Sequence, residues 1–178
     1  FDDIGNRDQT VINGGTTDYT ANLLNQYTAV GAASPAHDAD GNPTGDGTWT
    51  YTWDGENRLT AVEKSTQRLE FTYDWRGRRV QKKVYSGSTG NWSLTLERRF
   101  VYDGWNLLAI MDGNAALKQQ FMWGTDLSGT PQGAGGVGGL VKVYDHSLNK
   151  HFFPGYDGNG NIMLLVDGDT GAAAARYE

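Results

Sequence analysis

Residues 49–85 read WTYTWDGENRLTAVEKSTQRLEFTYDWRGRRVQKKVY and contain the same pattern twice. In each copy aromatic residues alternate with polar residues, a turn led by an aspartate follows, and an apolar segment comes after the turn. Alternation with a period of two residues is typical of β-strands that bury one face. An aspartate at the start of a turn, here Asp54 or Asp74, accepts a hydrogen bond from the backbone two residues on. The stretch therefore predicts two antiparallel β-hairpins with short loops.

The aspartate-led turn recurs along the chain. Copies begin at Phe1-Asp2, His37-Asp38, Trp53-Asp54, Tyr73-Asp74, Tyr102-Asp103 and Tyr156-Asp157, with a degenerate copy at Tyr144-Asp145. Repetition of one supersecondary unit indicates a fold in which neighbouring units complete each other's core. We predict an all-β protein of repeated antiparallel β-hairpins in a spiralling sheet or shell segment. Residues 1–178 are expected to form a single segment of this kind within a longer array.

The composition favours many short strands and excludes several kinds of site. Glycine accounts for 25 of the 178 residues, and the chain has six Trp and nine Tyr. Such a composition suits strands and turns better than helices. No apolar run approaches about 18 residues, so no membrane-spanning segment is expected. Cysteine is absent, which excludes disulfides, thiolate metal sites and a cysteine nucleophile.

The net charge of −6 is unevenly distributed along the chain. Residues 58–99 carry ten basic and four acidic side chains, whereas the remainder carries five basic and seventeen acidic ones. A basic surface can bind nucleic acid or an anionic glycan. Charged side chains on strands also prevent sheets from aggregating edge to edge. We favour this second interpretation, in which the basic residues lie at strand edges and face outward.

Two glycine-rich segments follow the Tyr-Asp hairpins in a fixed order. They are Trp123-Gly124-Thr125-Asp126-Leu127-Ser128-Gly129 and Gly135-Gly136-Val137-Gly138-Gly139-Leu140. With the hairpins they make nearly the whole chain resemble the bacterial Rhs/YD-repeat family. The resemblance implies a β-sheet that spirals into a hollow shell around a C-terminal effector, as in toxin complexes, polymorphic toxins and the related teneurins.

The chain departs from that family in one respect. The family's Tyr-Asp-Pro-x-Gly core, which can cleave the chain, has no counterpart here. The sequence contains no Asp-Pro, and it reaches Arg176-Tyr177-Glu178 where that core would begin. Neither the protease nor the effector is therefore expected in these residues.

No segment predicts a catalytic site, a cofactor or a metal. The glycine-rich residues 133–139 lack the Gly-Lys-Ser/Thr ending of a phosphate-binding loop and lie between predicted strands. The segments that begin at Asp38 and Asp157 resemble the start of a calcium loop but lack its later Gly and Glu. Hairpin turns explain both, with a weak surface cation as the alternative.

The chain has three histidines, His37, His146 and His151. We expect them in turns or facing solvent, with the last two on opposite faces of one strand.

The aromatic residues offer the clearest binding signal. The candidate ligand or packing aromatics are Trp49, Tyr51, Trp53, Tyr73, Trp75, Tyr102 and Trp105. Such rings can stack sugars or bases. They can also pack across strands, where each pair contributes about 0.2–1 kcal/mol, and this is the interpretation we favour. One apolar face is expected to hold Leu69, Phe71, Tyr73, Leu96, Phe100 and Tyr102.

These observations predict a protein that is not an enzyme. We expect a structural shell or scaffold segment of an Rhs/YD-repeat protein that encapsulates or presents a toxin effector, secreted or at the surface of a bacterium. The alternative is a carbohydrate-binding or adhesion module at the bacterial surface. Expected partners are neighbouring repeats or copies through edge strands Phe1–Arg7 and Arg176–Glu178, an enclosed effector polypeptide, or a glycan. Neither a nucleic acid nor a membrane is expected.

Overall fold

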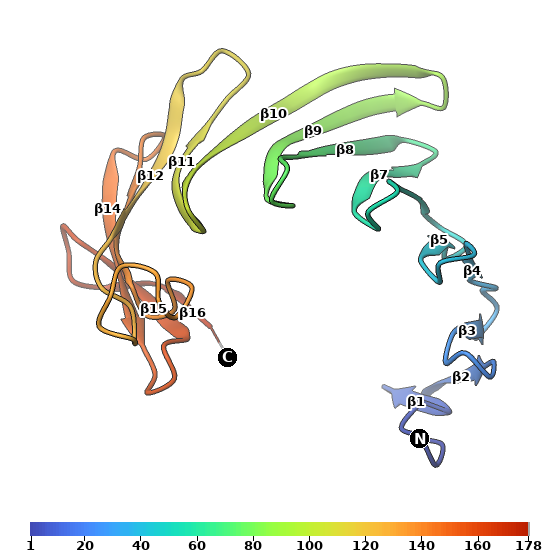
Figure 1. The fold of residues 1–178 in the computed structure, drawn as a ribbon. Coiled ribbons are helices and arrows are strands. Elements are labelled where there is room, and N and C mark those ends of the chain that lie inside the picture. The colour runs from blue at the N-terminus through green and yellow to red at the C-terminus, as the bar shows by residue number, and fades with distance from the viewer. Residues whose placement is uncertain (178) are drawn as a thin grey trace. The chain divides into compact units, whose positions relative to one another are not determined.

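The structure, a computed structural model, describes residues 1–177, and none of them lies in a helix (Figure 1). The strands are β1 (Gln9–Ile12), β2 (Gly15–Ala21), β3 (Tyr27–Val30), β4 (Ala36–His37), β5 (Pro43–Gly45), β6 (Thr50–Trp53), β7 (Leu59–Lys64), β8 (Gln67–Tyr73), β9 (Arg79–Ser88), β10 (Asn91–Asp103), β11 (Asn106–Met111), β12 (Leu117–Trp123), β13 (Leu140–Asp145), β14 (Lys150–Tyr156), β15 (Ile162–Asp167) and β16 (Ala173–Arg176). The prediction of an all-β fold built from antiparallel hairpins is confirmed. No helix in the described part of the chain could span a membrane.

The chain divides into two compact units. Unit 1 comprises Phe1–Phe71 and Val84–Thr95, and unit 2 comprises Thr72–Lys83 and Leu96–Glu178. Strands β8, β9 and β10 contribute residues to both units. The expectation of a single repeat-built segment remains a prediction.

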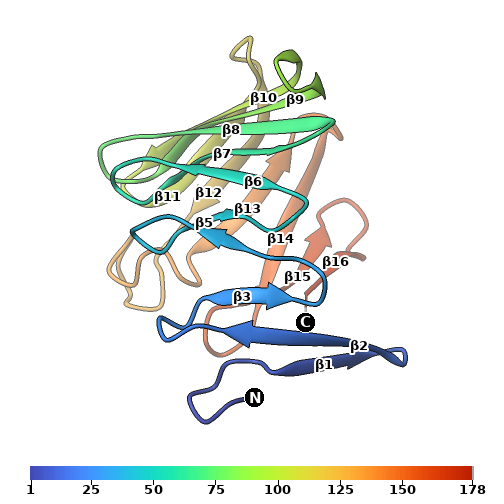
Figure 2. The same cartoon turned by 90° about the vertical axis from the view of Figure 1, so that its right-hand side faces the viewer.

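Unit 1 begins with a three-stranded antiparallel sheet in the order β1-β2-β3. Figure 2 shows β2 between the two shorter strands. The chain then forms the hairpins β4-β5 and β6-β7, and β7 pairs with β8. In this part Val62 lies opposite both Tyr51 and Leu69, so apolar side chains meet across three strands.

Unit 2 is a succession of antiparallel strands in which every strand from β10 to β16 pairs with the next one in the chain. The register places Gln120 of β12 opposite Tyr144 of β13, and Tyr144 opposite His151 of β14. Side chains opposite one another on neighbouring strands lie on the same face. The register therefore brings residues that are far apart in sequence to one place on this sheet.

Local side-chain chemistry forms the turns as predicted. Asp54 accepts hydrogen bonds at its Oδ1 from the backbone N–H groups of Glu56 and Arg58, both at 3.0 Å. Asn57 has a φ of 58°, a left-handed conformation that asparagine adopts more readily than most residues. The same bonding recurs in the turns that begin at Asp2, Asp38, Asp74, Asp112 and Asp157.

One predicted turn differs from this pattern. Asp103 pairs directly with Asn106 at the ends of β10 and β11, so only Gly104 and Trp105 connect the two strands. Gly104 has a φ of 53°, which allows this short connection.

The first predicted edge strand also differs. Residues 1–7 form a turn, in which the N–H of Asp2 donates to the carbonyl of Asn6 at 2.8 Å, and the first strand starts only at Gln9. Glu178, in the second predicted edge segment, lies outside the described residues.

The buried apolar core of the described residues is small. It consists of Ala61, Ala109, Leu140 and Val143, and no large side chain is fully buried. All six residues predicted for one apolar face are half-buried: Leu69, Phe71, Tyr73, Leu96, Phe100 and Tyr102. Because these residues divide between the two units, their common face remains a prediction.

Candidate functional site

A pocket of about 400 Å³ lies on β12, β13 and β14 of unit 2. Its lining residues are Leu108, Gln120, Phe121, Met122, Lys142, Tyr144 and His151. Met122 lies opposite Lys142, just as Gln120 lies opposite Tyr144. Residues two apart on a strand point to the same face, so these side chains share one face of the sheet.

Two histidines pack against the ring of Tyr144. The ring centroids of His146 and His151 both lie 4.6 Å from the centroid of Tyr144. His146 Nε2 lies 2.9 Å from the side-chain oxygen of Gln120, to which it donates a hydrogen bond. The hydroxyl of Tyr144 donates to the side-chain oxygen of Asn149. These contacts hold the rings in fixed positions at one end of the pocket.

Three polar groups at the pocket have no partner among the described residues. His151 Nδ1 is buried, and no described residue forms a hydrogen bond with it. The Nε2 amide of Gln120 and the ammonium group of Lys142 likewise have no hydrogen-bond or ion-pair partner among the described residues. The described residues of the lining supply one ammonium group and no carboxylate. The arrangement therefore suits an aromatic or apolar ligand that carries a negative charge.

The expectation that the two histidines lie on opposite faces of one strand is wrong. β13 ends at Asp145 and β14 begins at Lys150, so a hairpin turn separates the residues. Asp145 accepts hydrogen bonds from the backbone of this turn. The aspartate-led turn at Tyr144-Asp145 was the signal in the sequence that could have placed both histidines beside Tyr144.

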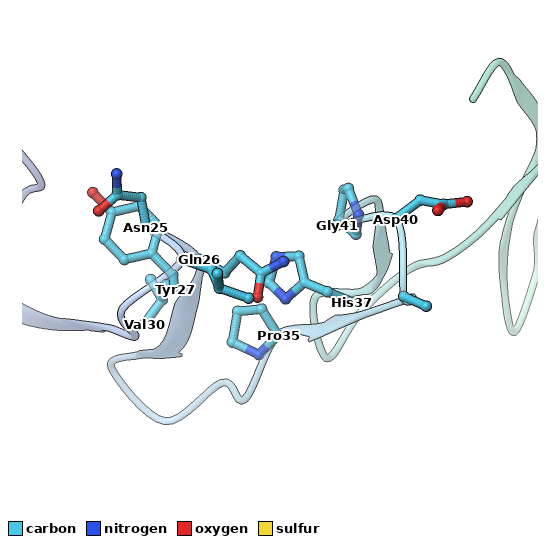
Figure 3. Close-up of a pocket in the computed structure, with 11 residues that line it drawn as sticks. Asn25, Gln26, Tyr27, Val30, Pro35, His37, Asp40 and Gly41 are labelled. Atoms are coloured by element: carbon cyan, nitrogen blue, oxygen red, sulfur yellow. The ribbon is translucent and has the colours of Figure 1, made fainter. Parts of the chain in front are cut away.

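A second pocket, of about 650 Å³, lies in unit 1 between the turn before β3 and the hairpin β4-β5. Figure 3 shows His37, Gln26 and Pro35 beside the same space. Of the described residues that line it, Asp40 is the only one with a carboxylate, and none is a lysine or an arginine. This pocket therefore offers an anionic ligand neither a lysine nor an arginine among the described residues, and it places a carboxylate beside the ligand.

The predicted aromatics of unit 1 are engaged in contacts within the protein. The hydroxyl of Tyr51 donates to Asp46 at 2.6 Å, and this bond with burial raises the pKa of Tyr51 to about 12. The indole N–H of Trp53 donates to the carbonyl of Pro43 at 2.7 Å. The Lys64 ammonium group lies 4.5 Å from the ring centroid of Trp49. These contacts agree with a packing role, while a ligand role remains a prediction.

The predicted aromatics of unit 2 differ in exposure. Trp75 is 83% exposed and Trp105 is 59% exposed, whereas Tyr73 and Tyr102 are half-buried. Arg78 joins the two turns that carry the tryptophans, because it pairs with Asp74 at 2.7 Å and donates to the carbonyl of Gly104.

Many cations of the basic span are paired with neighbouring carboxylates. Arg58 contacts Asp54 at 2.8 Å, and Arg99 contacts Glu97 at 2.8 Å. Arg68 pairs with two carboxylates, those of Glu63 and Glu70. These pairs weaken the positive potential that residues 58–99 suggested.

The glycine-rich loop of residues 124–139 is organised around a buried carboxylate that sequence reasoning missed. Asp126 accepts hydrogen bonds from the hydroxyl and the backbone N–H of Ser128 and from the N–H groups of Ala134 and Gly136. The hydroxyl bond is the main cause that lowers the pKa of Asp126, to about 2. In the described residues no group of three or more His, Cys, Asp or Glu side chains could hold a metal ion.

Comparison with known proteins gives a match over the whole chain. The chain is 32% identical over 187 residues to the tRNA3(Ser)-specific nuclease WapA of Bacillus spizizenii. It is 33% identical over 185 residues to the tRNA nuclease WapA of Bacillus subtilis. Both alignments cover 100% of the chain and 7% of the relative, so the chain spans only a small part of these proteins. No family model matches the chain.

This finding corrects four expectations from the sequence. The matched proteins are named as tRNA nucleases, which are bacterial enzymes. The match to these proteins overturns the assignment to the Rhs/YD-repeat family and the non-catalytic shell function. It also overturns the carbohydrate-binding alternative and the expectation that the protein is not an enzyme. The physical reason is that turns and alternating strands report how a backbone folds, and a fold does not determine a function.

Proposed function

We propose that this chain is part of a bacterial enzyme that cleaves tRNA. The observation that carries the proposal is the identity of 32–33% over the whole chain with relatives named as tRNA nucleases. Because the chain spans 7% of their length, the proposed activity belongs to the complete protein that contains these residues. Within that protein we assign the chain a part in tRNA recognition.

The surface chemistry of unit 2 supports a role in recognition. RNA-binding sheets stack unpaired bases on aromatic side chains and hold phosphates with cations. Unit 2 offers the exposed rings of Trp75 and Trp105, and beside Tyr144 it offers the ammonium group of Lys142, which has no partner in the part of the chain that the structure describes. This proposal replaces the expectation that no nucleic acid is a partner.

We further propose that the complete protein acts outside the cell that makes it, secreted or at the bacterial surface. An enzyme that cleaves tRNA stops translation in any cytosol where it is active. Export removes this danger from the producing cell. Fractionation of a bacterial culture, with an antibody against this chain, tests the location; a signal confined to the cytosol contradicts it.

The activity is tested with the complete protein and total bacterial RNA. Northern probes against individual tRNAs, with 5S ribosomal RNA as the control, distinguish specific cleavage from general degradation. We expect discrete fragments of one or a few tRNAs while 5S RNA stays intact. Intact tRNA after prolonged incubation, with and without divalent metal ions, would overturn the proposed function.

A further inference from the structure

We propose that the pocket on β12, β13 and β14 binds an unpaired nucleotide of the tRNA. This inference rests on the proposed function and names the contact through which the chain recognises its substrate. A volume of about 400 Å³ lies in the range of pockets that hold small ligands. It suits one nucleotide that has left its base stack and does not suit a double helix.

Aromatic rings at the pocket can hold a base. Tyr144 and His151 both line the pocket, and their rings pack on each other with centroids 4.6 Å apart, so a base stacks beside this pair and not between the rings. Unpaired RNA bases stack on tyrosine, phenylalanine and histidine side chains, a contact that tolerates every base because each has a π-face. Both rings are supplied by paired strands, so little order needs to be gained when a base binds.

Hydrogen-bonding groups at the pocket can contact the edge of that base. The side-chain oxygen of Gln120 is occupied by His146, which leaves the Nε2 amide of Gln120 to donate. His151 Nδ1 is buried and without a partner among the described residues. A buried polar atom that lacks a partner is costly, and a ligand gains from it where the His151 ring turns to meet the ligand. The donor of Gln120 needs no such movement.

Charge selects a nucleotide over a neutral aromatic ligand. Among the described residues of the lining, Lys142 is the only lysine or arginine, and none carries a carboxylate that competes for it. An ammonium group of this kind is a common phosphate contact. The larger pocket of unit 1 has the opposite character, because its lining includes Asp40 and no lysine or arginine. The phosphate of a nucleotide therefore fits the pocket beside Lys142.

Binding to fluorescein-labelled tRNA and to a short unstructured RNA, followed by anisotropy, tests the inference on the full 178-residue chain. Lys142→Gln removes the cation, and Lys82→Gln, a half-buried lysine of β9 outside the pocket, is its matched control. We expect Lys142→Gln to raise Kd about tenfold or more, as for the loss of a charged hydrogen bond. It should also reduce the slope of log K against log salt by about 0.7, as for one lost phosphate contact on a single strand.

A second pair of variants tests the apolar part of the pocket. Met122 is 57% exposed and lines the pocket, whereas Met163 on β15 is 41% exposed and does not. Met122→Glu places a negative charge where the nucleotide would lie, and Met163→Glu is its control. We expect Met122→Glu to weaken RNA binding about tenfold through like-charge repulsion and Met163→Glu to leave it unchanged. Unchanged thermal unfolding shows that each variant is folded.

The outcomes separate this inference from the proposed function. Wild-type affinity and salt slope in Lys142→Gln and Met122→Glu would overturn the pocket, even where the complete protein cleaves tRNA. A labelled RNA duplex is measured in the same way, and tighter binding of the duplex than of the unstructured RNA would also overturn the proposed pocket. The pocket variants can also lose RNA binding while the complete protein leaves tRNA intact. That result would contradict the proposed nuclease activity and support the nucleotide pocket.

Discussion

The backbone N–H of Gly136 donates a hydrogen bond to Oδ2 of Asp126 across ten residues of loop, at 3.1 Å. The N–H of Ala134 donates to the same oxygen at 2.7 Å. Asp126 is only 6% exposed, so these donors replace the water that a carboxylate otherwise binds. A charged acceptor of several N–H groups is a strong local constraint, and it explains how a loop so rich in glycine takes up one conformation.

Asp126→Asn is expected to lower the melting temperature of the chain. The amide keeps the shape of the carboxylate but loses the charge and places N–H donors against the N–H groups of the loop. Asp3→Asn, at an exposed position near the start of the chain, is the control and should leave the melting temperature within error. Equal melting temperatures for the two variants would show that Asp126 does not organise the loop.

Acid is expected to destabilise the chain between about pH 4 and pH 2. Hydrogen bonds from Ser128 and Lys150 are the main causes that lower the pKa values of Asp126 and Asp167, each to about 2. A carboxyl with a pKa lowered on folding stabilises the protein above its unfolded value, near 3.9, and loses that effect as pH falls through the folded value. Thermal unfolding from pH 7 to pH 2 measures this decline, and a constant melting temperature below pH 4 contradicts it.

Alkaline pH is expected to weaken the ion pair of Lys150 and Asp167, whose nitrogen and oxygen atoms lie 2.5 Å apart. The carboxylate of Asp167 raises the pKa of Lys150. A lysine with a raised pKa stabilises the protein below its unfolded value, near 10.4, and the contribution is lost as pH rises through the folded value. Lys150→Gln should therefore remove the part of the alkaline destabilisation that lies above pH 10. A wild-type profile in this variant would show that Lys150 contributes nothing to it.

Tyr73→Ala is expected to cost about 1–2 kcal/mol of unfolding free energy, less than the roughly 3–5 kcal/mol of a fully buried aromatic residue. Tyr73 is half-buried, so truncation removes packing on one side only. Trp75→Ala, two residues on and 83% exposed, should change stability by less than about 0.5 kcal/mol. Urea unfolding of both variants measures the difference, and equal losses would mean that the two side chains have similar environments.

The turns were predictable because their chemistry is local. The hydrogen bonds of Asp54 and Asp74 stay within four residues of the aspartate, so a short window of sequence contains all the information. The turn at Asp112 escaped the pattern because its left-handed residue is Ala115, with a φ of 63°, where other turns have Gly or Asn. Alanine gives no sign of that conformation in a sequence.

The candidate site was beyond prediction because it depends on register. Gln120 and Tyr144 are 24 positions apart, and only the pairing of β12 with β13 across a long glycine-rich loop places them opposite each other. A shift of one residue in this pairing would send the side chains of one strand to the other face. The role of Asp126 was hidden for a similar reason, since its partners Ala134 and Gly136 donate only backbone groups.

Association of copies was expected through Phe1–Arg7 and Arg176–Glu178, and the structure moves the candidate edges to the strands β1 and β16. Each of these strands is the outermost member of its hydrogen-bonded sheet. Val11 and Ile12 on β1 are exposed, and β16 carries three alanines before Arg176. Exposed apolar edge strands are templates for the addition of another strand, and a lysine on the edge blocks that addition. We therefore expect Val11→Lys or Ala174→Lys to lower the self-association of the chain, and the double variant to lower it further. Sedimentation at about 100 μM measures the association of the wild type, the two single variants and the double variant. Thr17→Lys, on the paired strand β2, is the control for added charge, because it leaves both edges unchanged. A wild-type chain that sediments as a monomer at this concentration would exclude pairing through either edge.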